Sequence, residues 1–220
     1  MMKQFAVIGL GRFGTSVATE LYKMGHEVLA VDSNMERVES IADHVTHAVC
    51  ADATDEAQLA ALGLGNFDVA VIGIGKDMQA SILVTMLCKE QGVKLVLTKA
   101  TSEMHAKVLQ RVGADKIVFP ERDMGARVAY NLVSTNILDY IELSPDYSLV
   151  EIAVPRQWEG QSMKELNLRV RYGINVMAIR HVNGDISVAP QGIDRLVDKD
   201  VLIAIGANSS IKKLESIAGK

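Results

Sequence analysis

Cysteine is scarce in this chain of 220 residues, which contains only Cys50 and Cys88. The two lie far apart and form no C-x-x-C pair, so the sequence predicts neither a disulfide framework nor a zinc site. We expect both to be small core residues in a reducing compartment. The chain also lacks an apolar run of the roughly 18 residues that a membrane helix needs, and its first residues lack a signal-peptide pattern. We therefore expect a soluble, cytoplasmic protein whose role at a membrane comes through a partner.

The chain also lacks a strong excess of basic or of acidic residues. The formal net charge is −4, and no block of like charges forms a basic or acidic tail. These features argue against a nucleic-acid partner, because nucleic-acid-binding domains carry a basic patch or stripe. By contrast, 49% of the residues are hydrophobic. That fraction is enough for a substantial core, in one large domain or in a large and a small one.

Recognisable catalytic motifs are absent too. The sequence contains neither a G-x-x-x-x-G-K-[ST] loop for phosphoryl transfer nor a G-x-S-x-G elbow for hydrolysis. A dehydrogenase needs a group that meets the nicotinamide, and the second half of the chain offers one histidine, His181, which precedes a turn. We expect the other histidines to be structural or exposed. The pattern favours a nucleotide sensor over an enzyme. In such a sensor, ligand binding biases the arrangement of the domains and of their partners.

A glycine-rich loop lies near the start of the chain. Gly9, Gly11 and Gly14 form the pattern G-x-G-x-x-G directly after the apolar residues Val7 and Ile8. The first glycine permits a tight turn out of a strand, the second lets a diphosphate approach the backbone, and the third lets helix and strand pack closely. The loop therefore predicts a phosphate site at a helix N-terminus, where free N–H groups and the helix dipole favour anions.

Two charged residues refine this interpretation. Asp32 ends a predicted strand about 18 residues after Gly14, near the usual position of the acid that binds a ribose hydroxyl. Arg12 is unusual, because a cation in the first turn of a helix opposes the dipole at a cost of about 0.3–1 kcal/mol. It is either a solvated arginine or a ligand for a further phosphate, as a nucleoside triphosphate would require.

Capping residues mark several predicted helices. Asn34 precedes a helix from Met35 to about Ala42, and Thr54 precedes one from Asp55 to Leu62. The first helix is expected at residues 15–24, where Gly25 closes it. Strands and helices alternate in this way up to about residue 120, with short connections between them. The sequence therefore predicts an α/β, Rossmann-like, doubly wound parallel sheet with helices on both faces.

Ligands of such sheets bind at the carboxyl ends of the strands. This rule places one set of candidate residues along a single rim: Gly9 to Gly14, Asp32, Asp52, Gly73, Gly75, Lys99 and Glu121. Further candidates for nucleotide binding lie beside them: Phe13, Ser33, Arg37 and Ala53. Taken alone, Glu121 is most simply an acid that complements the dipole of the next helix.

The sequence pattern changes after a helix predicted from Pro120 to about Thr135. Residues 136–145 mix apolar and turn residues, and later segments predict short strands, two helices and a hairpin turn at residues 182–185. The sequence therefore predicts a nucleotide-binding domain at residues 1–138, followed by a small α+β domain at residues 139–220.

Several motifs carry a family resemblance that covers the whole chain. They lie at residues 9–14, 51–54, 99–100, 113–115 and 119–125. The arginine inside the glycine loop and the stretch from Pro120 to Gly125 are the most specific of them. With these residues the chain resembles the RCK (regulator of K⁺ conductance) family, in particular the cytosolic gating subunits of bacterial Ktr potassium transporters.

The resemblance implies an assembly and a first ligand. Homodimers of the subunit would form an octameric ring on an integral-membrane K⁺ channel subunit of the KtrB or KtrD type. ATP or ADP would bind the first domain, and ATP would open the channel. Arg12 would reach the γ-phosphate bound in the neighbouring subunit, and Glu121 would help bind a divalent cation such as Mg²⁺ or Ca²⁺ at the dimer interface.

The resemblance also implies a second ligand, cyclic di-AMP, as an inhibitory signal bound between paired second domains. The residues that match its site are Met163, Lys164, Arg169, Ile174 and Asn175. An alternative function stays open beside this one. Asp32 suits the ribose of NAD(H) as well as that of ATP, so an NAD(H)-binding redox sensor or small oxidoreductase is the competing hypothesis.

Overall fold

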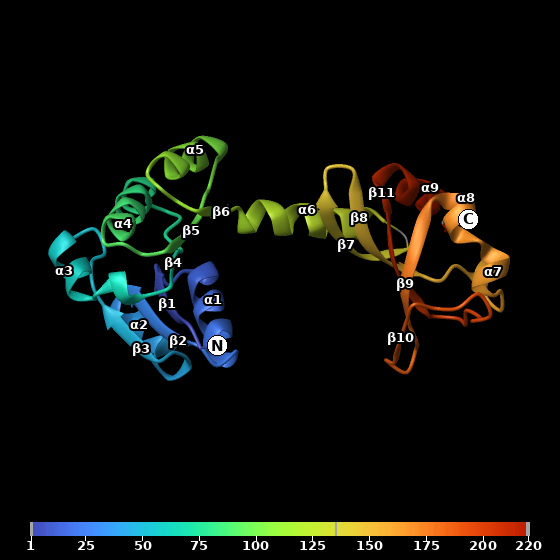
Figure 1. Ribbon diagram of the computed structural model, residues 1–220, viewed down its shortest axis with the longest axis horizontal. Helices are drawn as coiled ribbons and strands as arrows, with labels where there is room; N and C mark the ends of the chain where they lie inside the picture. The colour runs from blue at the N-terminus through green and yellow to red at the C-terminus, as the bar shows by residue number, and fades with distance from the viewer. Residues whose placement is uncertain (1, 135, 219–220) are drawn as a thin grey trace. The chain divides into compact units, whose positions relative to one another are not determined.

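The chain divides into two compact units, Met1–Glu121 and Arg122–Lys220. The computed structural model describes residues 2–134 and 136–218 (Figure 1). The division falls in the first turn of helix α6 (Pro120–Val133). The domain boundary that we placed after residue 138 stays a prediction, and each unit is described by itself below.

The first unit contains a six-stranded sheet in the order β3-β2-β1-β4-β5-β6. All neighbouring strands pair in parallel. This order reverses between β1 and β4, as it does in Rossmann folds, and it confirms the predicted fold class. The strands are β1 (Gln4–Ile8), β2 (Glu27–Asp32), β3 (His47–Cys50), β4 (Val69–Ile72), β5 (Leu95–Lys99) and β6 (Lys116–Val118).

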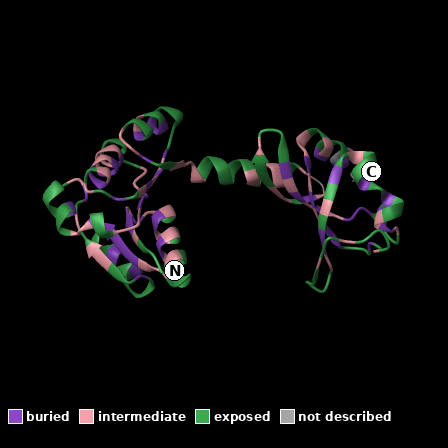
Figure 2. Ribbon diagram, viewed as in Figure 1, coloured by how far each residue is buried: buried purple, intermediate pink, exposed green. Residues whose placement is uncertain are grey.

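Helices cover both faces of this sheet because its strands are apolar on both sides. Val7 packs with Ala18 of α1 and Val38 of α2, whereas its neighbour Ile8 packs with Leu59 of α3 and with α4. Buried residues are concentrated in the strands (Figure 2). The helices are α1 (Arg12–Lys23), α2 (Met35–Ile41), α3 (Glu56–Ala61), α4 (Met78–Glu90) and α5 (Glu103–Arg111), with short 3₁₀ turns η1 (Ala42–His44) and η2 (Leu64–Asn66).

Some local predictions for the first unit need correction. Asn34 caps α2 as predicted, but Asp55, and not Thr54, caps α3 by accepting hydrogen bonds from two backbone N–H groups. Helix α1 begins at Arg12, three residues earlier than expected. Cys88 lies in the core, where burial raises the pKa of its thiol to about 12, whereas Cys50 is exposed, contrary to the prediction.

The second unit contains a five-stranded antiparallel sheet in the order β10-β9-β11-β8-β7. Its strands are β7 (Ile137–Ser144), β8 (Tyr147–Ala153), β9 (Ile174–Arg180), β10 (Ile186–Val188) and β11 (Val201–Ala207). Its helical segments after α6 are η3 (Arg156–Trp158), α7 (Met163–Leu166), α8 (Leu168–Tyr172) and α9 (Asn208–Ala218). A separate core joins the sheet to these helices and includes Ile152, Trp158, Leu202 and Ile211.

The stretch expected to mix apolar and turn residues is a full strand, β7. Ile137 is buried and Tyr140 stacks on Tyr130 of α6, with ring centroids 4.2 Å apart. Thr135, the expected end of α6, lies outside the described residues. In the described ranges, none of the helices combines the length and apolar character needed to cross a membrane.

Candidate functional site

Three glycines hold the start of the first unit together by backbone contact. Gly9 has a φ of +94°, and a Cβ there would lie 2.8 Å from the backbone nitrogen of Ile74. A Cβ at Gly14 would collide with the carbonyl oxygen of Gly9, and one at Gly73 would lie 2.6 Å from the same oxygen. β1, α1 and the end of β4 therefore meet without side chains at the point where the strand order reverses, which is where ligands of such sheets bind.

Gly11 differs from these three glycines. Its φ is −72°, which any residue adopts, and a Cβ there would meet nothing within 4 Å. It stands at the N-cap of α1 and provides no side-chain cap, and the first turn contains no acid. The first N–H groups of a helix have no partner inside the helix. The N-terminus of α1 thus has the features that favour an anion, with open space at Gly11.

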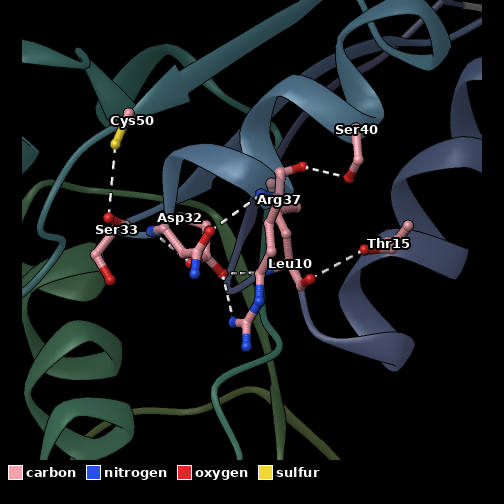
Figure 3. Close-up of polar contacts among 8 residues, drawn as sticks. Leu10, Thr15, Asp32, Ser33, Arg37, Ser40 and Cys50 are labelled. Atoms are coloured by element: carbon pink, nitrogen blue, oxygen red, sulfur yellow. Dashed lines mark hydrogen bonds and ion pairs between the residues drawn. The ribbon is translucent and has the colours of Figure 1, made fainter.

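Asp32, at the end of β2, is buried beside this loop. Its carboxylate accepts hydrogen bonds from the backbone N–H of Leu10 at 2.6 Å and of Asn34 at 2.9 Å, and Nη1 of Arg37 lies 3.3 Å away (Figure 3). A carboxylate offers about four lone-pair positions. These three donors therefore leave acceptor capacity for a further donor, such as a ribose hydroxyl.

The next strand end carries other predicted residues. The Sγ of Cys50 donates to the carbonyl oxygen of Ser33 over 3.6 Å (Figure 3). Asp52 accepts from the backbone N–H and the hydroxyl of Thr54, and the hydroxyl bond, followed by the N–H bond, lowers the pKa of Asp52. Ala53 is buried. Asp52 therefore closes its own turn, while Ser33 lies directly beside Asp32 in the chain.

Lys99 and Glu121 form an ion pair at the ends of β5 and β6. The hydrogen bond from Lys99 is the main reason that the pKa of Glu121 is lowered, and the charge of Arg12 adds to the effect. Phe13 packs half-buried against the core on the α1 side. Among the described residues, no group of three or more His, Cys, Asp or Glu side chains could hold a metal ion.

The second unit has a pocket of about 190 Å³ where α7, α8 and the start of β9 meet. Four of the five residues predicted for the second ligand line it, and Lys164 does not. The lining residues are Met163, Asn167, Leu168, Arg169, Ile174, Asn175 and Val176. Sequence reasoning missed Asn167, although asparagine is, after glycine, among the residues that best tolerate the left-handed φ of 45° found there.

The histidine of the second unit has structural partners. One ring nitrogen of His181 lies 3.2 Å from a carboxylate oxygen of Asp200, and the other lies 2.9 Å from the hydroxyl of Ser187. Asp200 is fully buried. These contacts tie the end of β9 to β10 and to the turn before β11, so His181 acts within the fold of the second unit.

Comparisons with known proteins extend these observations to the whole chain. A TrkA-N domain matches residues 5–120 and a TrkA-C domain matches residues 148–219. The Ktr system potassium uptake protein A of Bacillus subtilis (strain 168) is 46% identical over 214 residues, which cover 97% of this chain and 96% of that protein. Protein C of the same system and organism is also 46% identical, over 98% of this chain and 97% of its own length.

Solved structures agree with this fold. The GsuK channel matches 100% of this chain with a TM-score of 0.70 at 17% identity, and its NAD-bound form matches with a TM-score of 0.68. This chain spans 40% of the length of those channel chains. The chain therefore belongs to the family of Ktr system potassium uptake proteins of types A and C, the RCK-type regulatory subunits of Ktr potassium uptake, in which a TrkA-N domain is followed by a TrkA-C domain.

Proposed function

We propose that this chain binds ATP or ADP at the carboxyl edge of its parallel sheet and thereby controls a membrane K⁺ channel subunit. Its relatives of similar length carry the name of a potassium uptake system. Homodimers of the chain assemble into an octameric ring on the cytoplasmic side of that channel subunit, of the KtrB or KtrD type. The chain is a regulator and not an enzyme.

The observation that carries the nucleotide proposal is Gly11. The fold does not require glycine at this position, because the backbone is ordinary and a Cβ would meet nothing. A phosphate that approaches the first N–H groups of α1 does require it, because a side chain there would stand in the ligand's place. The open position lies next to Asp32, whose carboxylate is hydrogen-bonded to the same loop.

Each rim residue then has a role toward the nucleotide. Asp32 accepts hydrogen bonds from the ribose hydroxyls, and the N-terminus of α1 holds the phosphates. Arg12, exposed in the first turn of α1, reaches the γ-phosphate of the nucleotide in a neighbouring subunit. ATP and ADP differ in that phosphate alone, so a contact with it gives ATP the differential affinity that is needed to shift a ring between two states.

Glu121 takes part in cation binding only together with other oxygen ligands. Hard cations such as Mg²⁺ or Ca²⁺ need about six or more oxygens. A single carboxylate, within described residues that contain no larger acidic cluster, cannot supply them. The phosphates of ATP and the Glu121 of a second copy would complete the set at the dimer axis.

A second ligand, cyclic di-AMP, binds the pocket of the second unit and acts as an inhibitory signal. The pocket volume of about 190 Å³ is smaller than the roughly 300–1,000 Å³ of ordinary ligand sites. One chain therefore offers half of a site, and a second copy supplies the other half. Arg169 holds a phosphate through its planar guanidinium, and Ile174 covers a base.

The competing function is an NAD(H)-binding redox sensor or small oxidoreductase. One protein of similar fold, the GsuK channel, has a structure bound to NAD, and Asp32 suits either ribose. Thermal unfolding of the purified chain with ATP, ADP or NADH separates the two functions, since a ligand stabilises by RT ln(1 + [L]/Kd). We expect larger upshifts with ATP and ADP than with NADH. The reverse order would contradict the proposed function.

A further inference from the structure

Two cationic side chains and one carboxylate gather at the rim of the first unit. Lys99, the last residue of β5, pairs through Nζ with Oε1 of Glu121 in the first turn of α6. Arg12 begins α1 at the same rim, and its charge adds to the Lys99 hydrogen bond in lowering the pKa of the Glu121 carboxyl. The group therefore has one positive charge in excess of its carboxylate, beside the open N-terminus of α1.

The two partners of the ion pair differ in their surroundings. The Lys99 side chain is only 12% exposed, whereas that of Glu121 is 71% exposed. The surrounding protein therefore holds the lysine in place. The glutamate can rotate into solvent at little cost, because its carboxylate is already largely hydrated. In this pair the carboxylate is the exchangeable partner.

A glycine places the Lys99 ammonium next to the glycine loop. A Cβ at Gly75 would lie 3.3 Å from both Cε and Nζ of Lys99, so the lysine passes directly over this residue. Two residues earlier, Gly73 packs on the carbonyl oxygen of Gly9. The same short segment after β4 thus touches the phosphate-binding loop with one glycine and the Lys99 ammonium with the other.

We propose that Glu121 is an internal competitor for the nucleotide phosphates, and that Lys99 exchanges the Glu121 carboxylate for phosphate oxygens when a nucleoside triphosphate binds. This inference rests on the proposed nucleotide site. A lysine suits such an exchange, because its ammonium is a compact charge on a flexible stem and needs no fixed partner geometry. The exchange makes Lys99 a residue that distinguishes nucleotides by the number of their phosphates, since the carboxylate is replaced only where a phosphate beyond the one held at the N-terminus of α1 is present to take its place.

The exchange also couples nucleotide binding to the binding of a cation by Glu121. When the Lys99 ammonium pairs with phosphate oxygens, the Glu121 carboxylate is left without its ion-pair partner. Any other positive charge at the rim would then stabilise that carboxylate. A divalent cation and a triphosphate would then favour each other's binding, and by linkage each would tighten the other by the same factor. The ion pair in the nucleotide-free chain is the state from which this coupling starts.

Calorimetric titration with AMP, ADP and ATP in the presence of a chelator tests the proposal without interference from cations. Wild type is compared with Glu121→Gln, Lys99→Met and the double variant. We expect Glu121→Gln to tighten ATP by about fivefold, the size of one good solvent-accessible ion pair, and to leave AMP nearly unchanged. In the Lys99→Met background the same Glu121→Gln change should have no effect on ATP.

A matched control removes a different ion pair. Asp68 pairs with Lys94 at 3.0 Å, next to the start of β4 and therefore at the opposite end of the strands. Asp68→Asn changes the net charge by the same amount and should leave ATP affinity unchanged. In Lys99→Met, the methionine keeps most of the length of the lysine side chain and removes its charge. If Lys99→Met does not fold, the comparison of wild type with Glu121→Gln across the three nucleotides still tests the proposal.

The outcomes separate this inference from the proposed function. If ATP binds and Glu121→Gln leaves its affinity unchanged, the exchange is wrong while the nucleotide site stands. If Glu121→Gln tightens ATP equally with and without Lys99, Glu121 acts by simple repulsion of phosphate, and the exchange is again wrong. If wild type binds none of the three nucleotides, the proposed function itself has failed.

Discussion

Asp32 shows how one side chain can serve both the fold and a ligand. Its carboxylate holds the N–H of Leu10 in the glycine loop and the N–H of Asn34 before α2. The loop and the acid are therefore fixed relative to each other before any ligand binds. A ligand that meets such a site loses little free energy to ordering, which is the advantage of a preorganised site.

We predict that Asp32→Ala weakens ATP and ADP about equally, by on the order of 1.5–3 kcal/mol for a charge-assisted hydrogen bond. The two nucleotides share the ribose, so the ratio of their affinities should stay constant. Calorimetry measures both affinities, and thermal unfolding reports the accompanying loss of the loop contacts. A variant that loses ATP but keeps ADP would show that Asp32 does not bind the ribose.

Because β1 and α1 contact each other through backbone atoms, we predict that alanine has different effects on stability at two glycines of the loop. Gly14→Ala should destabilise the first unit, because the new Cβ collides with the carbonyl oxygen of Gly9. Gly11→Ala should cost only the weaker N-cap preference of alanine, about 1 kcal/mol or less, since its Cβ meets nothing. If the ligand uses this space, Gly11→Ala should nevertheless lose affinity for ATP.

Chemical unfolding and ATP titration of the same two variants provide the measurement. The informative result is Gly11→Ala, which should fold normally and bind poorly. Normal ATP affinity in that variant would mean that the phosphates do not approach the N-terminus of α1.

The contact between α6 and β7 predicts a pH dependence. Arg127 pairs with Asp139 through two nitrogens, one of them 2.7 Å from Oδ1, and this hydrogen bonding lowers the pKa of Asp139 from 3.8 to about 2. Because the folded pKa lies below the unfolded one, the stabilisation is complete above about pH 4 and disappears as the pH falls toward 2. The half-exposed pair should contribute about 1 kcal/mol after screening by solvent.

The fluorescence of Trp158 measures this effect, because it is the single tryptophan of the chain and lies buried in the second unit. Urea unfolding of Asp139→Asn should show a lower free energy of unfolding than wild type at neutral pH, with the difference shrinking near pH 2. A difference that stays constant across this range would assign the loss to packing and not to the ion pair.

Elements with regular patterns were predictable from the sequence, and elements that depend on tertiary contacts were not. Apolar strands followed by capped helices gave the parallel sheet. β7 was missed because it contains the charged residue Asp139, whose ion pair with Arg127 of α6 is a tertiary contact that the sequence does not reveal. The Lys99–Glu121 ion pair could not be predicted either, because the two residues lie on separate elements. The carboxyl ends of parallel strands share one edge of the sheet, but this does not predict which side chains contact each other there.

At the scale of the whole molecule, each unit has its own sheet and its own core. Separate cores allow two ligands to be bound independently, and a change in one unit need not disturb the other. The sequence predicted two domains with different topologies because the pattern of predicted elements changes after the helix expected from Pro120 to about Thr135. It could not predict which residues line the second pocket, because α7, α8 and β9 meet there by tertiary folding.

We predict that Arg169→Ala abolishes cyclic di-AMP binding and leaves ATP binding unchanged. Arg169 lines the pocket, whereas Arg171 lies on the same short helix and outside the pocket lining. Arg171→Ala is therefore the matched control and should keep affinity for both ligands. Calorimetry of the two variants with each ligand is the measurement. Cyclic di-AMP affinity that survives in Arg169→Ala would place its site elsewhere.

The unequal demands on the four glycines have a consequence for how such genes diverge. Gly9, Gly14 and Gly73 meet at one carbonyl oxygen, so a lineage that abandoned its ligand would still have to keep all three in order to fold. Gly11 carries no such obligation. In a diverged descendant, a bulky residue at position 11 would therefore indicate that the ligand is no longer bound. The other glycines of the motif would be kept because the fold requires them.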